Sequence, residues 1–174
     1  GSGWTSACTM DVVDLYLGGD CDVTLIEPYP DLAREVLGDS PGCKLIAEPV
    51  QRVAPEVFDA LGRGDILFID STHVLRTGSD VCFELFEILP RLKSGVLVHF
   101  HDMFWPFEYP ADWILNDNRS WNELYAIRAF LTDNPSWDIV FFNDFFAKMQ
   151  RPLIEQTFPV FFKNSGGALW IEKK

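Results

Sequence analysis

The feature that most constrains the fold is a short apolar run followed by an acid, which occurs twice in the middle of the chain. Residues 65–73 read Asp-Ile-Leu-Phe-Ile-Asp-Ser-Thr-His, and residues 95–102 read Gly-Val-Leu-Val-His-Phe-His-Asp. Apolar runs of this length are typical of strands that are buried on both faces of a parallel sheet. Ligands of such sheets gather beyond the carboxyl ends of the strands. We therefore expect a functional site where these two strands end.

All three histidines of the chain lie in these two stretches. Asp70 and His73 follow the first predicted strand, and His101 and Asp102 end the second. Side chains alternate along a strand, so His99 and His101 are predicted to share a face. We expect His99 to be a buried, hydrogen-bonded structural residue because it lies earlier in the strand. His101 is the better candidate for a site residue.

The rest of the chain indicates an α/β fold. Helical patterns and short apolar runs alternate up to residue 100, which predicts a parallel sheet covered by helices on both faces. Ser79 is predicted to cap one of these helices. After residue 102 the pattern changes to long loops at residues 103–119 and 144–166, with a capping box at residues 120–123 between them. Two final strands, at residues 137–142 and 167–171, are expected to pair antiparallel at one edge because no helix separates them.

Chain length and net charge limit the domain organisation and the partners that we expect. The 174 residues suit one domain over residues 1–174, and the net charge of −12 argues against a nucleic-acid or anionic-membrane partner. No apolar run approaches the roughly 18–20 residues that cross a bilayer. The four cysteines show no C-x-x-C spacing, so we expect buried free thiols and a reducing, cytoplasmic location.

Three stretches resemble one family of enzymes. Residues 65–80, 89–102 and 106–110 are similar to class I S-adenosylmethionine-dependent methyltransferases, and most of all to the branch called methyltransferase domain family 24. The resemblance runs from residue 1 to about residue 142 and returns at residues 168–171. It implies a Rossmann-like, doubly wound, mostly parallel sheet of seven strands with an antiparallel C-terminal edge strand. It also implies S-adenosylmethionine bound across the carboxyl ends of the first four strands.

The beginning of the chain departs from this family. Members carry a strand ending in an acid just before the first glycine, whereas this sequence starts at Gly1. We expect that the first strand lies upstream and that the domain is incomplete at its N-terminus. The alternative is that Gly-Ser-Gly is a vector scar.

The resemblance and the residues together suggest a cofactor site. Gly1 and Gly3 would let the backbone approach the cofactor, and Glu27 would accept the two ribose hydroxyls at the end of a strand. The family places adenine contacts near Gln51, and Asp70 would face the methionine ammonium. The alternatives are an ordinary glycine turn, a solvated acid at a strand end and a surface glutamine.

Three residues are candidates for catalysis: His73, His101 and Asp102. His73 is predicted to be the general base, because an imidazole removes protons near neutral pH, although it could instead only cap the next helix. Asp70 and Asp102 could also share a divalent cation such as Mg²⁺. The His101-Asp102 pair departs from the acids and amide of metal-binding relatives. Aromatic residues at 104–113 would wall an acceptor pocket or form a separate hydrophobic cluster.

These observations favour methyl transfer to a small-molecule or sugar-like acceptor, at oxygen. One alternative is a nicotinamide-dependent oxidoreductase, since a glycine loop and a strand-end acid serve both reactions. The third glycine of the dinucleotide fingerprint is absent, however, and Ser6 stands in its place. The other alternative is a non-catalytic module that retains the fold.

Overall fold

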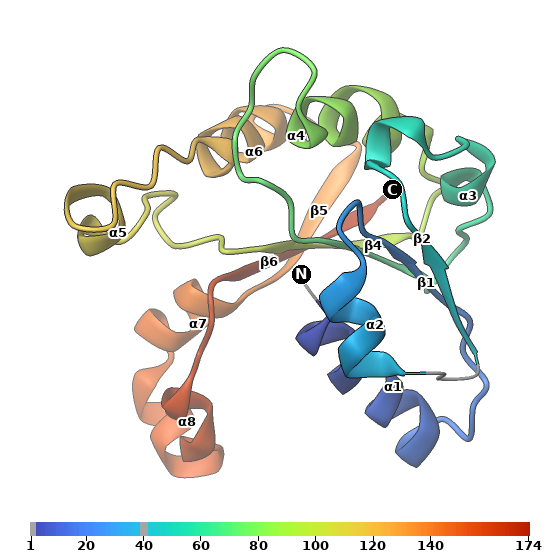
Figure 1. The fold of residues 1–174 in the computed structure, drawn as a ribbon. Helices are drawn as coiled ribbons and strands as arrows, with labels where there is room; N and C mark the ends of the chain where they lie inside the picture. The colour runs from blue at the N-terminus through green and yellow to red at the C-terminus, as the bar shows by residue number, and fades with distance from the viewer. Residues whose placement is uncertain (1–2, 39–41) are drawn as a thin grey trace. The chain divides into compact units, whose positions relative to one another are not determined.

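The structure is a computed structural model, and it describes residues 3–38 and 42–174. Its contacts divide it into two compact units, Gly1–Pro55 and Glu56–Lys174, and each unit is described by itself (Figure 1). The described residues form six strands in two sheets. The fold is mixed α/β with parallel strands and an antiparallel C-terminal strand. The single seven-stranded sheet and the single domain over residues 1–174 stay predictions.

The first unit contains a two-stranded parallel sheet. Val23 lies opposite Cys43 and Ile26 lies opposite Ile46, so the two strands end at the same edge. The elements of this unit are α1 (Trp4–Tyr16), β1 (Val23–Ile26), α2 (Asp31–Leu37), β2 (Cys43–Ile46) and the 3₁₀ turn η1 (Val50–Arg52).

Gly3 is required where α1 begins. Its φ of 112° lies in the region that residues with a side chain rarely adopt. A Cβ atom at this position would also come within 3.0 Å of the Ala33 Cα atom in α2. The glycine therefore permits both the turn into α1 and the close approach of the two helices.

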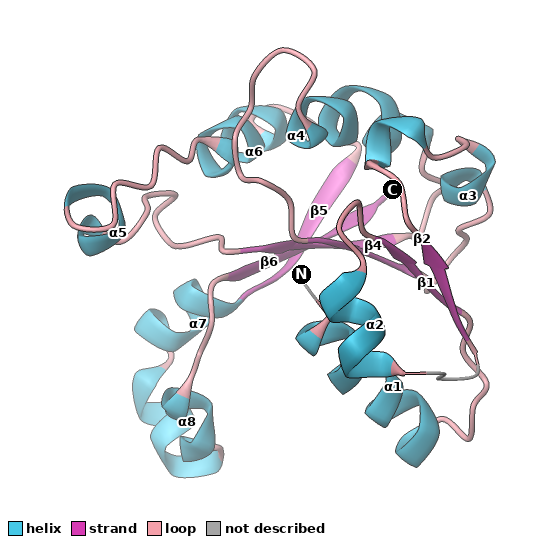
Figure 2. Cartoon of the chain, in the orientation of Figure 1, coloured by secondary structure: helices cyan, strands magenta, loops and turns pink. Residues whose placement is uncertain are grey.

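The second unit is built on a four-stranded sheet in the order β3-β4-β6-β5, with helices on both sides (Figures 1 and 2). Its strands are β3 (Ile66–Ile69), β4 (Leu97–His101), β5 (Trp137–Phe142) and β6 (Ala168–Lys173). Its helices and helical turns are α3 (Glu56–Asp59), α4 (Asp80–Phe83), the π-helical turn η2 (Glu84–Ile88), η3 (Leu89–Arg91), α5 (Ala111–Leu115), α6 (Glu123–Leu131), α7 (Asn143–Met149), α8 (Arg151–Thr157) and η4 (Pro159–Lys163).

The C-terminal strand is antiparallel, as predicted, but it is not an edge strand. β6 pairs with β4 on one side and with β5 on the other, so β5 forms the edge. Leu169 and Ile171 of β6 are completely buried, which suits a strand in the interior of a sheet. The prediction that the C-terminal strand is antiparallel was therefore confirmed, whereas the prediction that it lies at the edge of the sheet was wrong.

Two further expectations about local structure were wrong, and one was confirmed. Residues 144–166 form α7, α8 and η4 instead of a loop, and the loop after residue 102 contains α5. Short amphipathic turns of this kind take their stability from packing, which local sequence patterns do not reveal. The predicted Ser79 cap is present, because its Oγ atom accepts a hydrogen bond from the Cys82 N–H at 3.1 Å.

Two further properties concern membrane-spanning helices and the cysteines. Among the described residues, no helix combines the length and the apolar character that crossing a bilayer requires. All four cysteines are free thiols, and Cys8 and Cys21 are exposed rather than buried.

Candidate active site

Asp70 and Asp102 lie together beyond the carboxyl ends of β3 and β4. The two strands are parallel neighbours, with Ile69 opposite Phe100, so both chains leave the sheet at the same edge. This confirms the expected meeting of the two strand ends in the second unit. Both carboxylates are largely buried, with side-chain exposures of 20% for Asp70 and 19% for Asp102.

The His73 imidazole lies between these two carboxylates. Its Nε2 atom is 3.5 Å from Asp70 Oδ1 and 3.6 Å from Asp102 Oδ2. His73 and Asp102 both adopt left-handed backbone conformations, with φ values of 60° and 57°. Such conformations in residues other than glycine are uncommon and cluster at functional sites. The turns after both strands thus aim their side chains at one point.

Glu123 completes the cluster from the beginning of α6. Its Oε2 atom is 2.7 Å from His73 Nδ1, and both side chains are buried. The His73 carbonyl oxygen accepts hydrogen bonds from the N–H groups of Asn122 and Glu123 at 3.0 and 3.1 Å. The Asn122 side-chain oxygen also accepts from the Leu75 N–H at 2.6 Å. These bonds fasten the turn after β3 to the N-terminus of α6 and so fix the imidazole against Glu123.

The sequence predicted that Glu123 is the last residue of a capping box at residues 120–123, and this prediction was wrong. α6 begins at Glu123, with Asn122 at the N-cap and no side-chain capping bond. The carboxylate that would have turned back to the helix end binds His73 instead.

The carboxylates around His73 keep its imidazole protonated. Burial lowers the pKa of His73, but Asp70, Glu123 and Asp102 outweigh burial and raise that pKa to about 9. For Asp70, burial raises the pKa, and His73 is foremost among the groups that lower it, so the net shift is downward. At neutral pH the cluster thus contains the His73 imidazolium beside the ionised carboxylate of Asp70. Burial raises the pKa of Glu123, although its contact with His73 opposes the rise.

His101 and His99 occupy one face of β4, as predicted, but in different environments. His101 is the accessible histidine: 39% of its side chain is exposed, and its Nε2 atom lies 3.7 Å from Asp102 Oδ1. His99 is buried and stacks on Phe68 with ring centroids 4.1 Å apart. Burial lowers the pKa of His99 to about 4, with the nearby His101 as the second cause.

The hydrogen bonds expected for His99 are absent among the described residues. Neither Nδ1 nor Nε2 has a hydrogen-bond partner there. The ring packs instead against the Phe68 ring, in a stacked arrangement, and edge-on against the Trp170 ring.

The positions of Asp70 and Asp102 do not suit a shared metal ion. The imidazole of His73 occupies the place between the carboxylates where a cation would bind, and it carries a positive charge there itself. Across residues 3–38 and 42–174, no group of three or more histidine, cysteine or acidic side chains has the arrangement of a metal site.

Aromatic side chains pack beside His73. The Trp121 ring centroid lies 4.2 Å from that of His73, and Trp113 packs edge-on against Trp121 at 5.4 Å. Phe104 packs edge-on against Trp113 at 5.1 Å. The guanidinium of Arg119 lies over Trp113 at 4.1 Å. The aromatic stretch of the sequence therefore reaches the cluster through the contact of Trp113 with Trp121.

The candidate cofactor residues of the first unit lie beyond strand ends. Glu27 directly follows β1, and its Oε1 atom accepts a hydrogen bond from the Tyr29 N–H at 2.9 Å. Gln51 lies in η1, after β2, and is exposed on the surface. Gly3 makes the turn into α1, whereas Gly1 lies outside the described residues.

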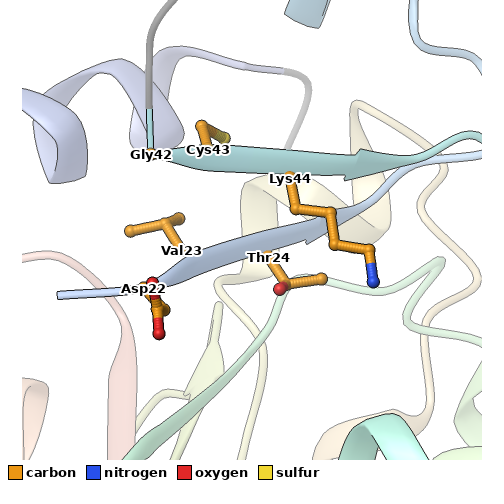
Figure 3. A pocket seen from close by; sticks show the side chains of 6 residues that line it. All are labelled: Asp22, Val23, Thr24, Gly42, Cys43 and Lys44. Atoms are coloured by element: carbon orange, nitrogen blue, oxygen red, sulfur yellow. The ribbon is translucent and has the colours of Figure 1, made fainter.

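The hollow in this unit lies at the other end of the strands. Figure 3 shows it beside the first residues of β1 and β2, where its lining includes Val23, Thr24, Cys43 and Lys44. Ligands of parallel sheets bind beyond the carboxyl ends, so this hollow is not the cofactor site that the sequence predicts.

Two acidic residues of the second unit were missed by the sequence analysis, Glu123 and Glu84. Both are buried, at 1% and 8% exposure. For Glu123 a signal existed: a helix that follows a strand begins at the carboxyl edge of the sheet, so an acid in its first turn lies near the site. For Glu84 no sequence signal was available, because its burial depends on the π-helical turn η2.

Comparison with known families supplies the identity that the geometry leaves open. Residues 1–103, more than half of the chain, match a methyltransferase domain family, the same family 24 that the sequence resembles. Searches of curated proteins and of solved structures gave no match. The family match does not support the alternatives of an oxidoreductase or a non-catalytic module. The chain belongs to the methyltransferase domain family and is an S-adenosylmethionine-dependent methyltransferase.

Proposed function

We propose that this enzyme transfers a methyl group to a hydroxyl oxygen of a small-molecule or sugar-like acceptor at the carboxyl ends of β3 and β4. The observation that carries this proposal is the pairing of an accessible histidine, His101, with Asp102 beside a buried imidazolium. A hydroxyl that attacks a methyl group must lose its proton, and an imidazole backed by a carboxylate accepts one. S-adenosylmethionine supplies the methyl group, carried on a positively charged sulfur.

His101 is the proposed general base, and Asp102 orients it. The 3.7 Å separation of their side chains is long for a hydrogen bond, and such contacts often tighten when substrate binds. His73 is less suited to the role that the sequence suggested for it. It is 4% exposed, and its raised pKa of about 9 keeps its proton in place at neutral pH.

We assign His73 a positioning and electrostatic role instead. As an imidazolium it holds Asp70 and Asp102 on either side and offsets their repulsion. The sum of these charges still leaves the cluster negative. A negative site favours the positively charged methyl donor.

Candidate cofactor residues are proposed for each unit by itself. In the first unit, Gly3 would let the backbone approach the cofactor, Glu27 would accept the ribose hydroxyls, and Gln51 would contact the adenine. The glycine-specific backbone of Gly3 and the strand-end position of Glu27 support this assignment. In the second unit, Asp70 would face the ammonium of the methionine part, which its position just beyond the carboxyl end of β3 supports.

The aromatic cluster of Phe104, Trp113 and Trp121 is proposed as the acceptor wall. Methyl transfer is an in-line displacement, which benefits from water exclusion and close positioning of the nucleophile. The contact of Trp121 with His73 supports this role, because it ties the wall to the charged cluster.

The test is a screen for acceptors with S-adenosylmethionine labelled in its methyl group. Hydroxylated small molecules, sugars included, are offered in pools, and methylated products are identified by mass spectrometry and located by NMR. We expect O-methylated products, and Asp102→Asn should lose roughly 10²–10⁴-fold in rate. The matched control is Asp138→Asn, a change to an exposed acid of β5 that pairs with Lys174. Products methylated only at nitrogen or carbon, or full activity in Asp102→Asn, would contradict the proposal.

A further inference from the structure

The aromatic wall of Phe104, Trp113 and Trp121 holds a cation, the guanidinium of Arg119. The Arg119 Cζ atom lies 4.1 Å from the centroid of the Trp113 ring and 4.8 Å from that of Trp121. Of the cation–ring contacts in the described part of the chain, only these two involve the wall. Because Trp121 also packs on His73, the guanidinium is separated from the charged cluster by one ring.

The backbone also holds Arg119 at the wall. Its N–H group donates a hydrogen bond to the Trp113 carbonyl oxygen at 2.9 Å. The side chain is nevertheless 34% exposed. A guanidinium that lies over aromatic rings keeps its N–H groups in its own plane, where they can bind a planar carboxylate edge to edge. Arg119 therefore combines an anchored position with accessible donors.

One acid competes for these donors, namely Asp117. The Arg119 Nη2 atom lies 3.3 Å from Asp117 Oδ2, and the Asp117 side chain is 48% exposed. An ion pair that is exposed in this way contributes little free energy. A guanidinium has five N–H donors, and Asp117 is its one ion-pair partner among residues 3–38 and 42–174. The pair therefore leaves donors for a second carboxylate.

The charge of Arg119 is opposite to the acidic side chains nearby. Asp70, Asp102 and Glu123 lie around the single imidazolium of His73, so the cluster offers no attraction to an anionic group of the acceptor. Arginine binds carboxylates through two parallel hydrogen bonds. A phosphate monoester carries more negative charge than a carboxylate, so these acids would repel it more strongly. The wall therefore suits a carboxylate better than a phosphate.

We infer that Arg119 binds a carboxylate of the acceptor, so that the acceptor is a hydroxy acid, sugar acids included. This inference rests on the proposed function, because it uses the aromatic cluster as the acceptor wall. Arg119 is then a specificity-determining residue. It selects which hydroxyl compounds bind, without contacting the oxygen that is methylated.

Two probes of matched shape test the inference without methyl transfer. 3-Hydroxybenzoate is ionised at pH 7, whereas 3-hydroxybenzamide is neutral. The indole N–H signals of Trp113 and Trp121 in NMR spectra, assigned with Trp113→Phe and Trp121→Phe, report binding at the wall. We expect the wild type to bind the acid at least about tenfold more tightly than the amide. Arg119→Gln should remove this preference.

Arg128→Gln is the matched control, because Arg128 is an exposed arginine of α6, and it should retain the full preference. Arg119→Lys keeps the charge and loses the planar fork, so it should retain only part of the preference. Equal shifts of the signals by both probes in the wild type, or no shift by the acid, would overturn the inference whether or not a variant folds. So would an Arg119→Gln variant that binds both probes more weakly by the same factor, because Arg119 would then only join the two rings.

Steady-state kinetics separates this inference from the proposed function. With an acid from the acceptor screen, Arg119→Gln should raise KM roughly tenfold or more and change kcat little, because the carboxylate lies away from the reacting oxygen. If the screen yields O-methylated products of neutral acceptors alone, the inference fails and the proposed function stands. If the probes show the Arg119-dependent preference but no O-methylated product forms, the proposed function fails and the carboxylate site stands.

Discussion

His73 Nδ1 lies 2.7 Å from Glu123 Oε2, and both side chains are almost completely buried. This contact joins the turn after β3 to the first residue of α6, across 50 residues of sequence. It leaves the opposite nitrogen of the ring facing Asp70 and Asp102. The orientation of the His73 ring toward Asp70 and Asp102 therefore depends on Glu123, an acid that is distant in sequence.

Removing the charge of Glu123 should destabilise the fold. Glu123→Gln leaves the buried imidazolium without its nearest carboxylate, and breaking a buried pair in this way costs about 3 kcal/mol or more. The measurement is the free energy of unfolding in urea at pH 7. Glu155→Gln, on the surface of α8, is the control and should lose about 0.5 kcal/mol or less. Equal effects of the two changes would show that the pair is unimportant.

His101→Ala should lose roughly 10²–10⁴-fold in methyl-transfer rate if His101 is the general base. Its side chain is 39% exposed, so added imidazole should enter the space and restore part of the rate. The same addition should not rescue His73→Ala, because that position is closed to solvent. The comparison uses the acceptor identified in the screen. If added imidazole restored the rate of His73→Ala and not that of His101→Ala, His73 would be the general base and His101 would have the positioning role.

Glu27→Ala should weaken the binding of S-adenosylmethionine. Hydrogen bonds from the ribose to a charged carboxylate contribute about 1.5–3 kcal/mol, which is roughly a 10–150-fold change in Kd. Isothermal titration calorimetry measures this directly. Glu35→Ala, an exposed acid of α2, is the matched control. An unchanged Kd for Glu27→Ala would remove Glu27 from the site.

His99→Phe should stabilise the second unit. The change removes two buried nitrogens that have no partner among the described residues and keeps a ring against Phe68, for a gain of about 1–3 kcal/mol at pH 7. The pKa of His99 lies near 4 in the folded chain, so the unfolded chain binds a proton first as pH falls from 6.5. The wild type loses stability over that interval and the variant does not. Unfolding curves at pH 7 and pH 5 should therefore show that the variant gains more free energy of unfolding over the wild type at pH 5. A variant that is less stable than the wild type at both pH values would contradict the account.

The sequence predicted the parts of the site that are local to a strand. An apolar run followed by an acid marks a strand end, which is why Asp70 and Asp102 were found and their meeting was expected. The expectation that both strands are buried on both faces was wrong for β3, since Ile66 and Phe68 are exposed. The shared face of His99 and His101 follows from strand alternation in the same way. The helices at residues 143–157 were missed because their stability depends on packing, of α7 against β5 and β6 and of α8 against α7 and η4.

Protonation states could not be predicted from the sequence. An isolated His73 is a natural general base, and only its three carboxylate neighbours convert it into an imidazolium. Glu123 was assigned to a helix cap because both roles use an acid at the same position of a helix. The sequence pattern does not distinguish an acid that turns back to its own helix from one that reaches a distant imidazole.

The state of His73 tests the account most directly. With three histidines in the chain, ¹⁵N NMR of the imidazole rings can follow each one through a pH titration, with His99→Phe and His101→Ala used for assignment. We predict that both ring nitrogens of His73 remain protonated at pH 7 and that the ring titrates near pH 9. A His73 ring that is neutral at pH 7, titrating at or below 6.5, would contradict the buried imidazolium on which the proposed site is built.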